Sequence, residues 1–548
     1  MLFAEVPPPP PAIVQPAYDT RIRLNTVGFL PSTRKEATIG APCKKFTLLR
    51  VSDGAVVFTG TAAQPIKTDK EDTDEQVQIV DFSEFRTPGQ YRLQVEGVGS
   101  SAPFTIAADV WNTPYEAAAR AMYLWRCGTA VETTWNGTKF SHAPCHLDDA
   151  WMDYAEGEHK KVPSLGGWHD AGDYNKYVVN AGVTIGMMLK AWEQFPKQVA
   201  TDNLGIPESG NGVPDLLDEI RWELDWLFTM QADDGRVYHK VSARDFKFWG
   251  PSENDKSVRY FTPWSTVATA DFTAIMAACA RAWRPFDAAF ADRCLAAARK
   301  SWGILARTPQ QVDADQSAFS TGAYAPKDAS HRLWALAELW ETTNEAAFLQ
   351  EFEKSTRAFG AAFTFDGPNW GDVQNLAFAT YLSSAHPDAR DAKLVKLLTD
   401  SLVKQARAAV EMSEKNGYGR PLGGARKTWY WGANGTVAGQ TLVLNLADRL
   451  RPDRRYRETA QRALDFLFGR NFHARSYVTG IGANPPLHPH DRRGEPAWPG
   501  YLVGGGWPNG RSWADLLARY DLNEIAINWN GALLYATAAF VEPTSPSK

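Results

Sequence analysis

The chain is organised around the stretch Gly166-Gly167-Trp168-His169-Asp170-Ala171-Gly172-Asp173-Tyr174-Asn175-Lys176-Tyr177. Two acids, Asp170 and Asp173, stand three residues apart there between small residues and aromatics. Gly172 allows the backbone to turn or to approach a ligand closely, and the aromatics offer flat apolar faces with polar tips. Paired carboxylates in such a setting suit a general base aimed at a water molecule. The alternative interpretation is a turn whose Asp caps the helix that follows.

Length, composition and charge indicate a globular protein of more than one domain. The 548 residues are 44% hydrophobic and 22% charged, which allows two or more domains with sizeable cores. The formal net charge of -5 argues against a nucleic-acid partner, because nucleic acids are bound through basic patches. No run of eighteen apolar residues occurs, so we expect no membrane partner either.

Tryptophan, cysteine and the amino terminus narrow the class of protein further. The 21 Trp and 18 Tyr suit either heavy helix packing or platforms for flat ligands such as sugars. Five scattered cysteines are too few for a disulfide framework. Met1-Leu2-Phe3-Ala4 followed by proline gives no signal-peptide pattern. Two expectations remain: an intracellular protein, or an exported one whose signal is missing from this chain.

The first hundred residues indicate a leader and a β-rich domain. A run of prolines within residues 1–19 predicts an extended leader with little order. Residues 20–106 contain short strand patterns separated by turn signals such as Asp53-Gly54 and Pro88-Gly89. Strands and turns at this spacing predict an immunoglobulin-like β-sandwich.

An apolar period of 3.6 residues begins at Trp111 and predicts a helical domain over residues 110–541, followed by a tail over residues 542–548. Many of its helices are rich in alanine and apolar on more than one face, as in a helical barrel with buried inner helices. About twelve helices are predicted, at 114–126, 181–194, 214–231, 269–282, 287–306, 332–343, 345–361, 373–384, 392–412, 434–449, 456–469 and 523–540. Long loops, which usually carry function, are predicted at 127–180, 232–268, 413–433 and 471–522.

Two cysteines and two histidines near the opening stretch form a candidate metal site. They are Cys127, Cys145, His146 and His169, a set that can hold zinc tetrahedrally. Their spacing is not that of a zinc finger. Four protein ligands would leave no open position on the ion, so we interpret the site as structural rather than catalytic. The alternative is a disulfide between Cys127 and Cys145 beside two unrelated histidines.

A loop rich in histidine and arginine runs through Leu487-His488-Pro489-His490-Asp491-Arg492-Arg493. It is followed by the aromatic stretch Trp498-Pro499-Gly500-Tyr501. His and Arg side chains on a loop can donate hydrogen bonds to hydroxyl groups and can stabilise a buried carboxylate. The alternative interpretation is a polar surface loop without a ligand.

A single acid stands before the last apolar helix, in Asp521-Leu522-Asn523-Glu524-Ile525-Ala526-Ile527-Asn528-Trp529-Asn530. We expect Glu524 to begin that helix, and an acid at such a position is favoured by the helix dipole alone. The functional interpretation is that Ile525, Ala526 and Trp529 desolvate the carboxyl group. Desolvation raises the pKa of a carboxyl, as a general acid at neutral pH requires.

With these stretches identified, the chain resembles glycoside hydrolase family nine, and more narrowly the bacterial cellulases of that family that carry an N-terminal immunoglobulin-like domain. The resemblance rests on Asn25–Pro31 at the opening of the sandwich, Gly167–Tyr174 as the base motif, and His490–Arg492 as a substrate-binding His-x-Arg. Asn523–Asn530 matches the acid motif, and Trp431–Asn434 is a further sequence match to the family. Together these motifs are highly specific, although none is so alone.

The resemblance implies an (α/α)6 barrel after the sandwich and inverting hydrolysis of β-1,4-glucosidic bonds. By position, Asp173 would be the general base, Asp170 would help hold the water, and Glu524 would be the general acid. The sugar-contacting positions that it implies are His490, Arg492, Trp431 and Trp529. The same subgroup carries a structural zinc at the positions of Cys127, Cys145, His146 and His169.

One departure concerns calcium. Relatives often have an Asp-Glu pair that can bind calcium before the helix at Arg332, whereas this chain has Ser330 and His331. The resemblance therefore gives no support for calcium there. The stretch Glu208–Asp215 could hold calcium instead, and a helix-entry turn with Asp215 near the helix dipole is the equal alternative.

We therefore expect a secreted or periplasmic, monomeric glycosidase that cleaves β-1,4-glucan or cello-oligosaccharides, most simply as an endoglucanase. Exo-acting relatives remain as alternatives: a cellobiohydrolase, a β-glucosidase or a glucosaminidase. A different class, a carbohydrate-binding protein without turnover, would be expected to lack one of the two acids, and both Asp173 and Glu524 are present.

Overall fold

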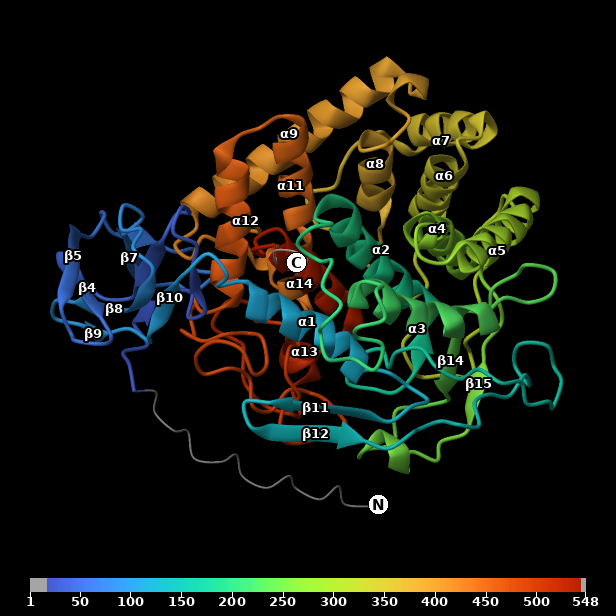
Figure 1. Ribbon diagram of the computed structural model, residues 1–548, viewed down its shortest axis with the longest axis horizontal. Coiled ribbons are helices and arrows are strands. Elements are labelled where there is room, and N and C mark those ends of the chain that lie inside the picture. Colours follow the sequence, from blue (N-terminus) through green and yellow to red (C-terminus); the bar gives the residue numbers. More distant parts are fainter. Residues whose placement is uncertain (1–16, 544–548) are drawn as a thin grey trace.

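The structure, a computed structural model, describes residues 17–543 (Figure 1). The expected leader over residues 1–19 and tail over residues 542–548 therefore lie, apart from their inner ends, outside the described residues. The predicted fold class is confirmed: a β-sandwich, blue in Figure 1, is followed by a barrel of helices.

Two sheets form the sandwich. The first has the strand order β1 (Ile22–Arg23), β3 (Glu36–Ile39), β7 (Gln76–Asp81), β6 (Ile66–Lys67). The second has the order β2 (Gly28–Phe29), β10 (Phe104–Ile106), β8 (Gly89–Val95), β4 (Lys45–Arg50), β5 (Val56–Thr61), and β9 (Gly99–Ser100) pairs with β8. Tyr91, Leu93 and Val95 alternate along β8 and are buried, as period-two strands packed on one face require.

The helices alternate between an inner and an outer layer. The inner helices are α2 (Val178–Gln194), α4 (Thr266–Trp283), α6 (Ala329–Thr343), α8 (Gln374–Leu382), the consecutive pair α10 (Ala433–Gly439) and α11 (Thr441–Leu450), and α14 (Ile527–Ala538). The outer helices are α1 (Asn112–Leu124), α3 (Asp215–Thr229), α5 (Ala288–Arg307), α7 (Ala346–Phe359), α9 (Ala392–Lys415) and α12 (Arg454–Leu467). Within the described residues, no helix has the length and apolar character needed to cross a bilayer.

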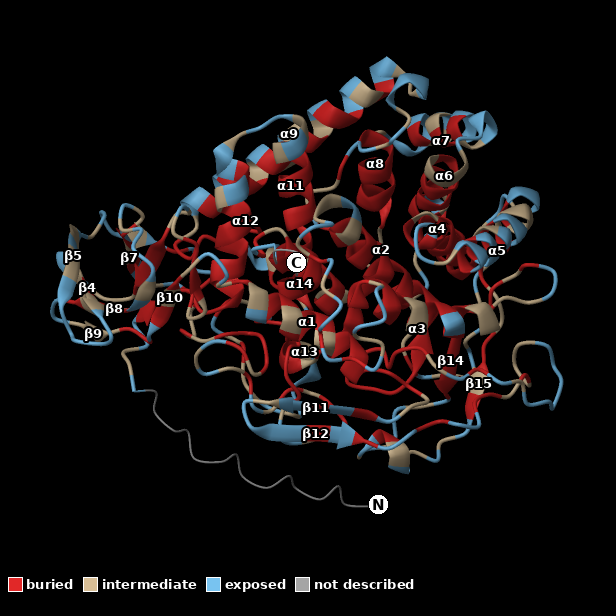
Figure 2. Cartoon of the chain, in the orientation of Figure 1, coloured by how far each residue is buried: buried red, intermediate tan, exposed pale blue. Residues whose placement is uncertain are grey.

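Burial explains which helices lie inside. Helix α14 buries residues on almost every side, whereas α9 buries one stripe that includes Leu394, Leu398, Leu402 and Ala406. That i, i+4 spacing places the stripe on one face and leaves the rest of α9 in water, as the mixed colours of α9 show in Figure 2. Helix α14 packs on α2, and α2 on α4, so the last inner helix meets the first and the ring closes.

Two predicted helices are interrupted. The helix expected over 434–449 divides at Gln440 into α10 and α11. At this point the backbone of Gly439 lies so close to Gly367 that a Cβ at Gly367 would lie 2.2 Å from the Gly439 carbonyl carbon. The helix expected over 523–540 divides into a short α13 (Tyr520–Asn523) and α14, with Glu524 in extended backbone between them. The expectation that Glu524 begins the last helix is therefore wrong, because the helix begins at Ile527.

Two of the predicted long loops, 127–180 and 232–268, contain short strands that the sequence patterns did not indicate. A hairpin joins β11 (Val131–Trp135) to β12 (Thr138–His142). A second small sheet pairs β13 (Lys176–Tyr177), β14 (Lys240–Ala243) and β15 (Arg259–Phe261). This sheet holds the segment after Asp173 against the loop 232–268 and thereby positions one wall of the site.

Candidate active site

Three of the predicted motifs meet at one place. The Arg492 backbone N–H donates to the Gly172 carbonyl at 3.1 Å, and the His490 backbone N–H donates to the Asn523 carbonyl at 2.9 Å. A Cβ at Gly172 would lie 2.4 Å from the His490 carbonyl oxygen, so the position needs glycine because of a close backbone approach. The first N–H of α14, at Ile527, donates to the Asp170 carbonyl at 2.9 Å. The stretches that carry Asp173, Arg492 and Glu524 are thus bonded to one another.

Asp173 has one engaged and one open carboxylate oxygen. Its Oδ2 accepts hydrogen bonds from the backbone N–H of Asn175 at 3.2 Å, the Asn175 side-chain amide at 2.5 Å and the Tyr177 hydroxyl at 3.3 Å. Within the described residues, Oδ1 accepts none. The carboxylate is therefore held rigidly while one oxygen stays available to a ligand such as water.

Asp170 is held on both oxygens. Asn180 donates to Oδ1 at 2.7 Å and the Tyr324 hydroxyl donates to Oδ2 at 2.7 Å. Burial, and after it the charge of Asp173, raise the pKa of Asp170 well above its usual range. Because both Asp170 oxygens are engaged by the protein, Asp173 is the acid of this pair with an oxygen to offer.

Glu524 lies in extended backbone, with φ -69° and ψ 155°. Its carbonyl accepts from the Gly504 N–H at 2.9 Å, and its backbone pairs with His490 in a short bridge. These bonds take the place of helix bonds and explain why α14 begins three residues later. Burial, and after it the charges of Asp173 and Asp170, raise the pKa of Glu524 well above its ordinary value. The carboxyl therefore keeps its proton to a higher pH than a solvated Glu would.

His490 and Arg492 lie beside the acids, as the His-x-Arg motif predicts. The His490 Nδ1 is 2.7 Å from the Leu517 carbonyl, so this nitrogen carries the proton in the neutral ring and Nε2 is left as an acceptor. Burial lowers the pKa of His490, which favours the neutral ring. Arg492 donates from Nε to the Phe248 carbonyl at 3.0 Å, and its positive charge opposes the rise in the pKa of Glu524.

Sequence reasoning missed the aromatic loop that covers Arg492. The guanidinium carbon of Arg492 lies 5.2 Å from the ring centroid of Phe246 and 5.6 Å from that of Trp249. Trp249 is 47% exposed and contacts the His490 ring edge to face. The Tyr174 hydroxyl anchors the loop through the Gly250 carbonyl at 2.6 Å. The aromatic run from Phe246 to Trp249 inside the predicted long loop 232–268 was the available signal.

The two predicted tryptophans differ in accessibility. Trp431 is 47% exposed and meets the Tyr520 ring, which in turn meets His490. Trp529 is only partly exposed and packs on Gly432 and Gly435, where a Cβ would come within 2.5 and 2.3 Å of its ring. Trp431 is therefore free to stack on a ligand, whereas much of Trp529 supports the loop beneath it.

A further exposed tryptophan was not singled out from the sequence. Trp370 is 41% exposed and contacts the ring of Tyr324, the residue that bonds Asp170. It adds an aromatic face next to the residue that holds Asp170. No local pattern marked it, because its neighbours Asn369, Gly371 and Asp372 read as a turn.

The four predicted metal ligands converge. One ligand atom from each of Cys127, Cys145, His146 and His169 lies within 4.8 Å of all the others, and all four residues are buried. The two sulfurs are 4.0 Å apart and the thiols are free, so the alternative of a disulfide is wrong. Burial lowers the pKa of His169 to about 3, and hydrogen bonding to Cys127 lowers the pKa of Cys145 to about 7. Neutral imidazole and easily ionised thiol are the forms that bind a metal.

The residues around this cluster orient its histidines. The His146 Nε2 contacts Asp255 Oδ2 at 3.2 Å, which leaves Nδ1 directed at Cys127. His169 directs Nε2 at Cys145, at 3.5 Å. A carboxylate bonded to the outer nitrogen of a ligand His is the usual second layer of a metal site. The donor set, its spacing and its surroundings fit a metal ion.

Comparison with known proteins gives the family. Residues 111–537 match Glycosyl hydrolase family 9 and residues 17–100 match the Cellulase N-terminal ig-like domain. The chain belongs to glycosyl hydrolase family 9. It is 49% identical to Endoglucanase D of Acetivibrio thermocellus over 538 residues, which are 96% of this chain and 84% of that protein.

Two solved structures of the family share the whole architecture. A metagenome-derived glycoside hydrolase family 9 endoglucanase superposes with a TM-score of 0.88 and 34% identity, covering 95% of this chain and 98% of that one. A Zn-binding triple mutant of the family 9 endoglucanase J30 superposes with a TM-score of 0.87 and 30% identity, covering 94% and 100%. The sandwich and barrel of this family 9 hydrolase therefore recur together.

Within residues 17–543, neither stretch considered for calcium gathers three or more metal-binding side chains. His331 Nδ1 lies 2.6 Å from Asp271 Oδ1, and both residues are fully buried, so an imidazole already partners that carboxylate. In the second candidate stretch, Arg126 binds both oxygens of Glu208, and Asp215 Oδ2 accepts from the Leu204 N–H. Among the described residues, the Cys/His cluster is the one group of metal-binding side chains that converges.

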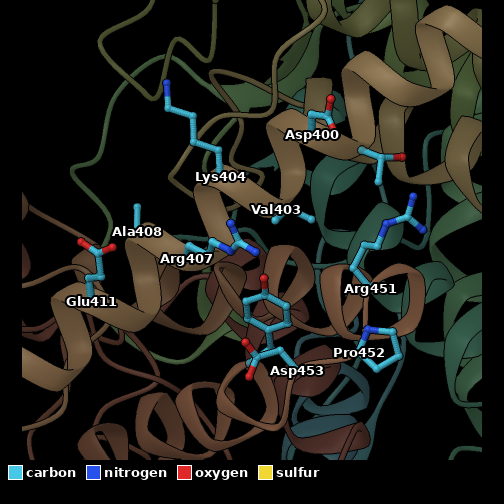
Figure 3. A pocket seen from close by; sticks show the side chains of 11 residues that line it. Asp400, Val403, Lys404, Arg407, Ala408, Glu411, Arg451, Pro452 and Asp453 are labelled. Carbon is cyan, nitrogen blue, oxygen red and sulfur yellow. The ribbon is translucent and has the colours of Figure 1, made fainter.

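The family 9 site is also distinct from a large hollow on the outside of the barrel. A cavity of about 860 Å³ lies between α9 and the turn Arg451–Asp453 (Figure 3). Lys404, Arg407 and Glu411 line it from α9. Charges of both signs surround it, and it contains neither the acids nor the Cys/His cluster.

Proposed function

We propose that this family 9 hydrolase is an endo-β-1,4-glucanase that acts with inversion on cellulose or related β-glucans. One observation supports it most: Asp173 with a free oxygen and Glu524 with a raised pKa are held together by bonded backbone. That pairing supplies a base and an acid from two carboxyl groups, the arrangement that glycoside hydrolysis uses. A sugar-binding protein without turnover would not need it.

In the proposed reaction, protonated Glu524 donates its proton to the leaving oxygen. Asp173 accepts a proton from a water molecule through Oδ1, and this water attacks the sugar carbon from the opposite face. Asp170, fixed by Asn180 and Tyr324, helps to position the water through its place beside Asp173. His490 and Arg492 bind hydroxyl groups of the sugar that lies next to Glu524.

The aromatic residues support an endo mode. Exposed tryptophans lie at two places around the acids: Trp370 contacts Tyr324, which holds Asp170, and Trp431 and Trp249 lie near His490. Pyranose rings have apolar faces that pack on such rings. Platforms at two separate places support binding of a chain across the cleavage point, whereas an exo enzyme needs one end closed.

The test is hydrolysis of carboxymethylcellulose followed by viscosity and by reducing ends together. We expect viscosity to fall early relative to the release of reducing ends, and Glu524→Gln and Asp173→Asn to remove activity while folding. Release of cellobiose or glucose alone at constant viscosity would establish an exo enzyme. Lack of turnover by the wild-type chain on any β-1,4-glucan would overturn the proposal.

We also propose that the metal at Cys127, Cys145, His146 and His169 is zinc with a structural role. Two thiolates and two neutral imidazoles suit tetrahedral Zn²⁺ and leave no position for water. When bound, the ion would cross-link the loop that carries Asp170 without taking part in proton transfer. Metal analysis should give one zinc per chain, and Cys145→Ser should lose it. Native protein without metal would contradict this proposal.

The proposed polymeric substrate and the origin of the site from one chain support two further proposals. Cellulose chains cannot enter a cell, so the enzyme would act as a secreted or periplasmic protein. We propose that it works as a monomer, because the proposed acids and cluster all come from one chain. Cell fractionation and light scattering test these statements, and a cytoplasmic enzyme or a stable dimer would contradict them.

A further inference from the structure

A surface groove lies where the sandwich meets the barrel loops. It has a volume of about 580 Å³, and we call it the interdomain groove, defined by Glu71, Arg426, Lys427 and Trp507. Glu71 comes from the loop between β6 and β7 of the sandwich, and the others come from two barrel loops. The Glu71 carboxylate accepts from the Arg426 backbone N–H at 3.3 Å, so the two domains touch at the groove.

Two segments lead from the catalytic acid to this groove. The Gly504 N–H bonds the Glu524 carbonyl, and Trp507 follows three residues later, a span of at most about 10 Å. The second segment carries Trp431, which meets Tyr520 beside His490, and two residues earlier Trp429, which lines the groove. Both segments therefore connect the surroundings of Glu524 with residues that line the groove.

The side chains of the groove suit a sugar. Trp507 is 43% exposed and offers an aromatic face. Arg426 and Lys427 are exposed, and their side-chain nitrogens donate to no residue within 17–543. An accessible indole face surrounded by free donors and a carboxylate matches the alternation of apolar ring faces and hydroxyl edges in a pyranose chain. A purely apolar partner would leave these charges unpaired.

The loop that carries Glu71 is fixed to the barrel. Asn416 donates to Asp72 Oδ2 at 3.0 Å, and the Gly510 N–H donates to the Asp72 carbonyl at 3.2 Å. A Cβ at Gly424 would lie 2.4 Å from Asp72 Oδ2, so the fit is close. The backbone next to Glu71 is therefore fixed against the barrel.

We propose that the interdomain groove is a distal subsite for β-1,4-glucan chains that extend beyond the catalytic acid, with Trp507 as the stacking platform. In this subsite the sandwich contributes Glu71 to substrate binding. The inference rests on the proposed glucanase function and extends it. It predicts that kcat/KM and affinity increase further when the substrate chain extends beyond the sugars that contact Trp431.

The experiment compares Trp507→Ala with wild type on cellotetraose, cellohexaose and carboxymethylcellulose. The kcat/KM ratio of long to short substrate should fall by about three- to tenfold, the worth of one aromatic contact. Lys427→Ala should lower the ratio by a smaller factor. Leu397→Ala, an exposed residue of α9, is the matched control and should leave the ratio unchanged. Calorimetry with cellohexaose in an inactive Glu524→Gln background should show the same loss of affinity.

The outcomes separate the two proposals. If the wild-type enzyme turns over no β-1,4-glucan, the proposed function is overturned, and the distal subsite that rests on it is overturned too. An active wild type whose length ratio is unchanged in both Trp507→Ala and Lys427→Ala overturns the distal subsite. Glu71→Ala tests the sandwich separately: an unchanged length ratio in this variant would remove the sandwich from the subsite.

Discussion

At the scale of single residues, three carboxyl groups of the site differ in their hydrogen bonds and pKa because their surroundings differ. Asp173 keeps one oxygen free, Asp170 has both oxygens engaged, and Glu524 is shielded from solvent beside the negative charges of Asp173 and Asp170. Burial and like charges both favour the neutral form of a carboxyl. The family resemblance suggested a role for each of these three acids, but no sequence motif could show which carboxylate oxygens are engaged, because a donor such as Tyr324 lies 154 residues from Asp170.

Asp170→Asn should shift the pH profile of activity. The negative charge of Asp170 contributes to the raised pKa of Glu524, so removing that charge lowers the pKa of the acid. In the proposed mechanism Glu524 must be protonated to act, so activity should be lost as pH rises through its pKa. The alkaline limb of kcat/KM against pH should therefore move to lower pH. An alkaline limb that stays in place or moves up would contradict this account of Glu524.

At the scale of elements, what could be predicted depended on how local the signal was. The helices followed from apolar periods, and the Cys/His set and the acids followed from short motifs. The break at Glu524 could not be predicted, because bonds from Gly504 and His490, distant in sequence, hold that segment extended. The aromatic loop at Phe246–Trp249 was missed because its value comes from its contact with Arg492.

Gly172→Ala should test the junction of the three motifs. The added methyl would lie 2.4 Å from the His490 carbonyl, so the backbone that positions Asp173 and Arg492 must move. We expect kcat to fall at least tenfold, because a displacement near 1 Å is costly in a preorganised site. The barrel, whose core is elsewhere, should still fold.

Gly303→Ala is the matched control for this variant. It lies in α5, and the nearest atom to its Cβ is 3.6 Å away at the end of the Arg307 side chain. A helical Gly→Ala change of this kind stabilises by about 0.4–1 kcal/mol. Activity assays and thermal melts of both variants decide the point, and an active Gly172→Ala enzyme would mean that the junction tolerates movement.

At the scale of the whole molecule, a buried charge cluster joins the sandwich to the barrel. Glu36 of β3 accepts from Arg462 at 3.0 Å and from Arg470 at 2.6 Å, and all three side chains are buried. Burial alone would raise the pKa of Glu36, but Arg470 and Arg462 outweigh it and hold that pKa well below its ordinary value. No sequence pattern links residues this far apart, so this interface could not be predicted.

Glu36→Gln should destabilise the protein by about 3–5 kcal/mol, since it leaves two buried guanidinium groups without their partner. A depressed folded pKa gives stability that is present above the unfolded pKa and is lost as pH falls toward the folded one. The variant should therefore differ most from wild type at neutral pH and less in acid. Denaturant unfolding at two pH values measures this.

Glu132→Gln is the control for that experiment. Glu132 pairs with Lys139 on the exposed hairpin, with both side chains mostly in water, and such pairs contribute about 0–1 kcal/mol. If the two variants lost equal stability, the buried cluster would not be what couples the domains.

The closed ring of helices also sets the stereochemistry that we expect. Asp173 precedes α2 and Glu524 precedes α14, and these two inner helices pack on each other. Packed helices stand roughly 8–10 Å apart, so acids at their adjacent ends should be separated by a distance that admits a water. An inverting pair stands roughly 6.5–9.5 Å apart, whereas a retaining pair stands about 5–5.5 Å apart. Proton NMR of fresh product from a β-linked cello-oligosaccharide should therefore show the α-anomer first. If the β-anomer formed first, Asp173 would be a nucleophile rather than a base, and the free Oδ1 that we assign to water would instead have to reach the sugar carbon.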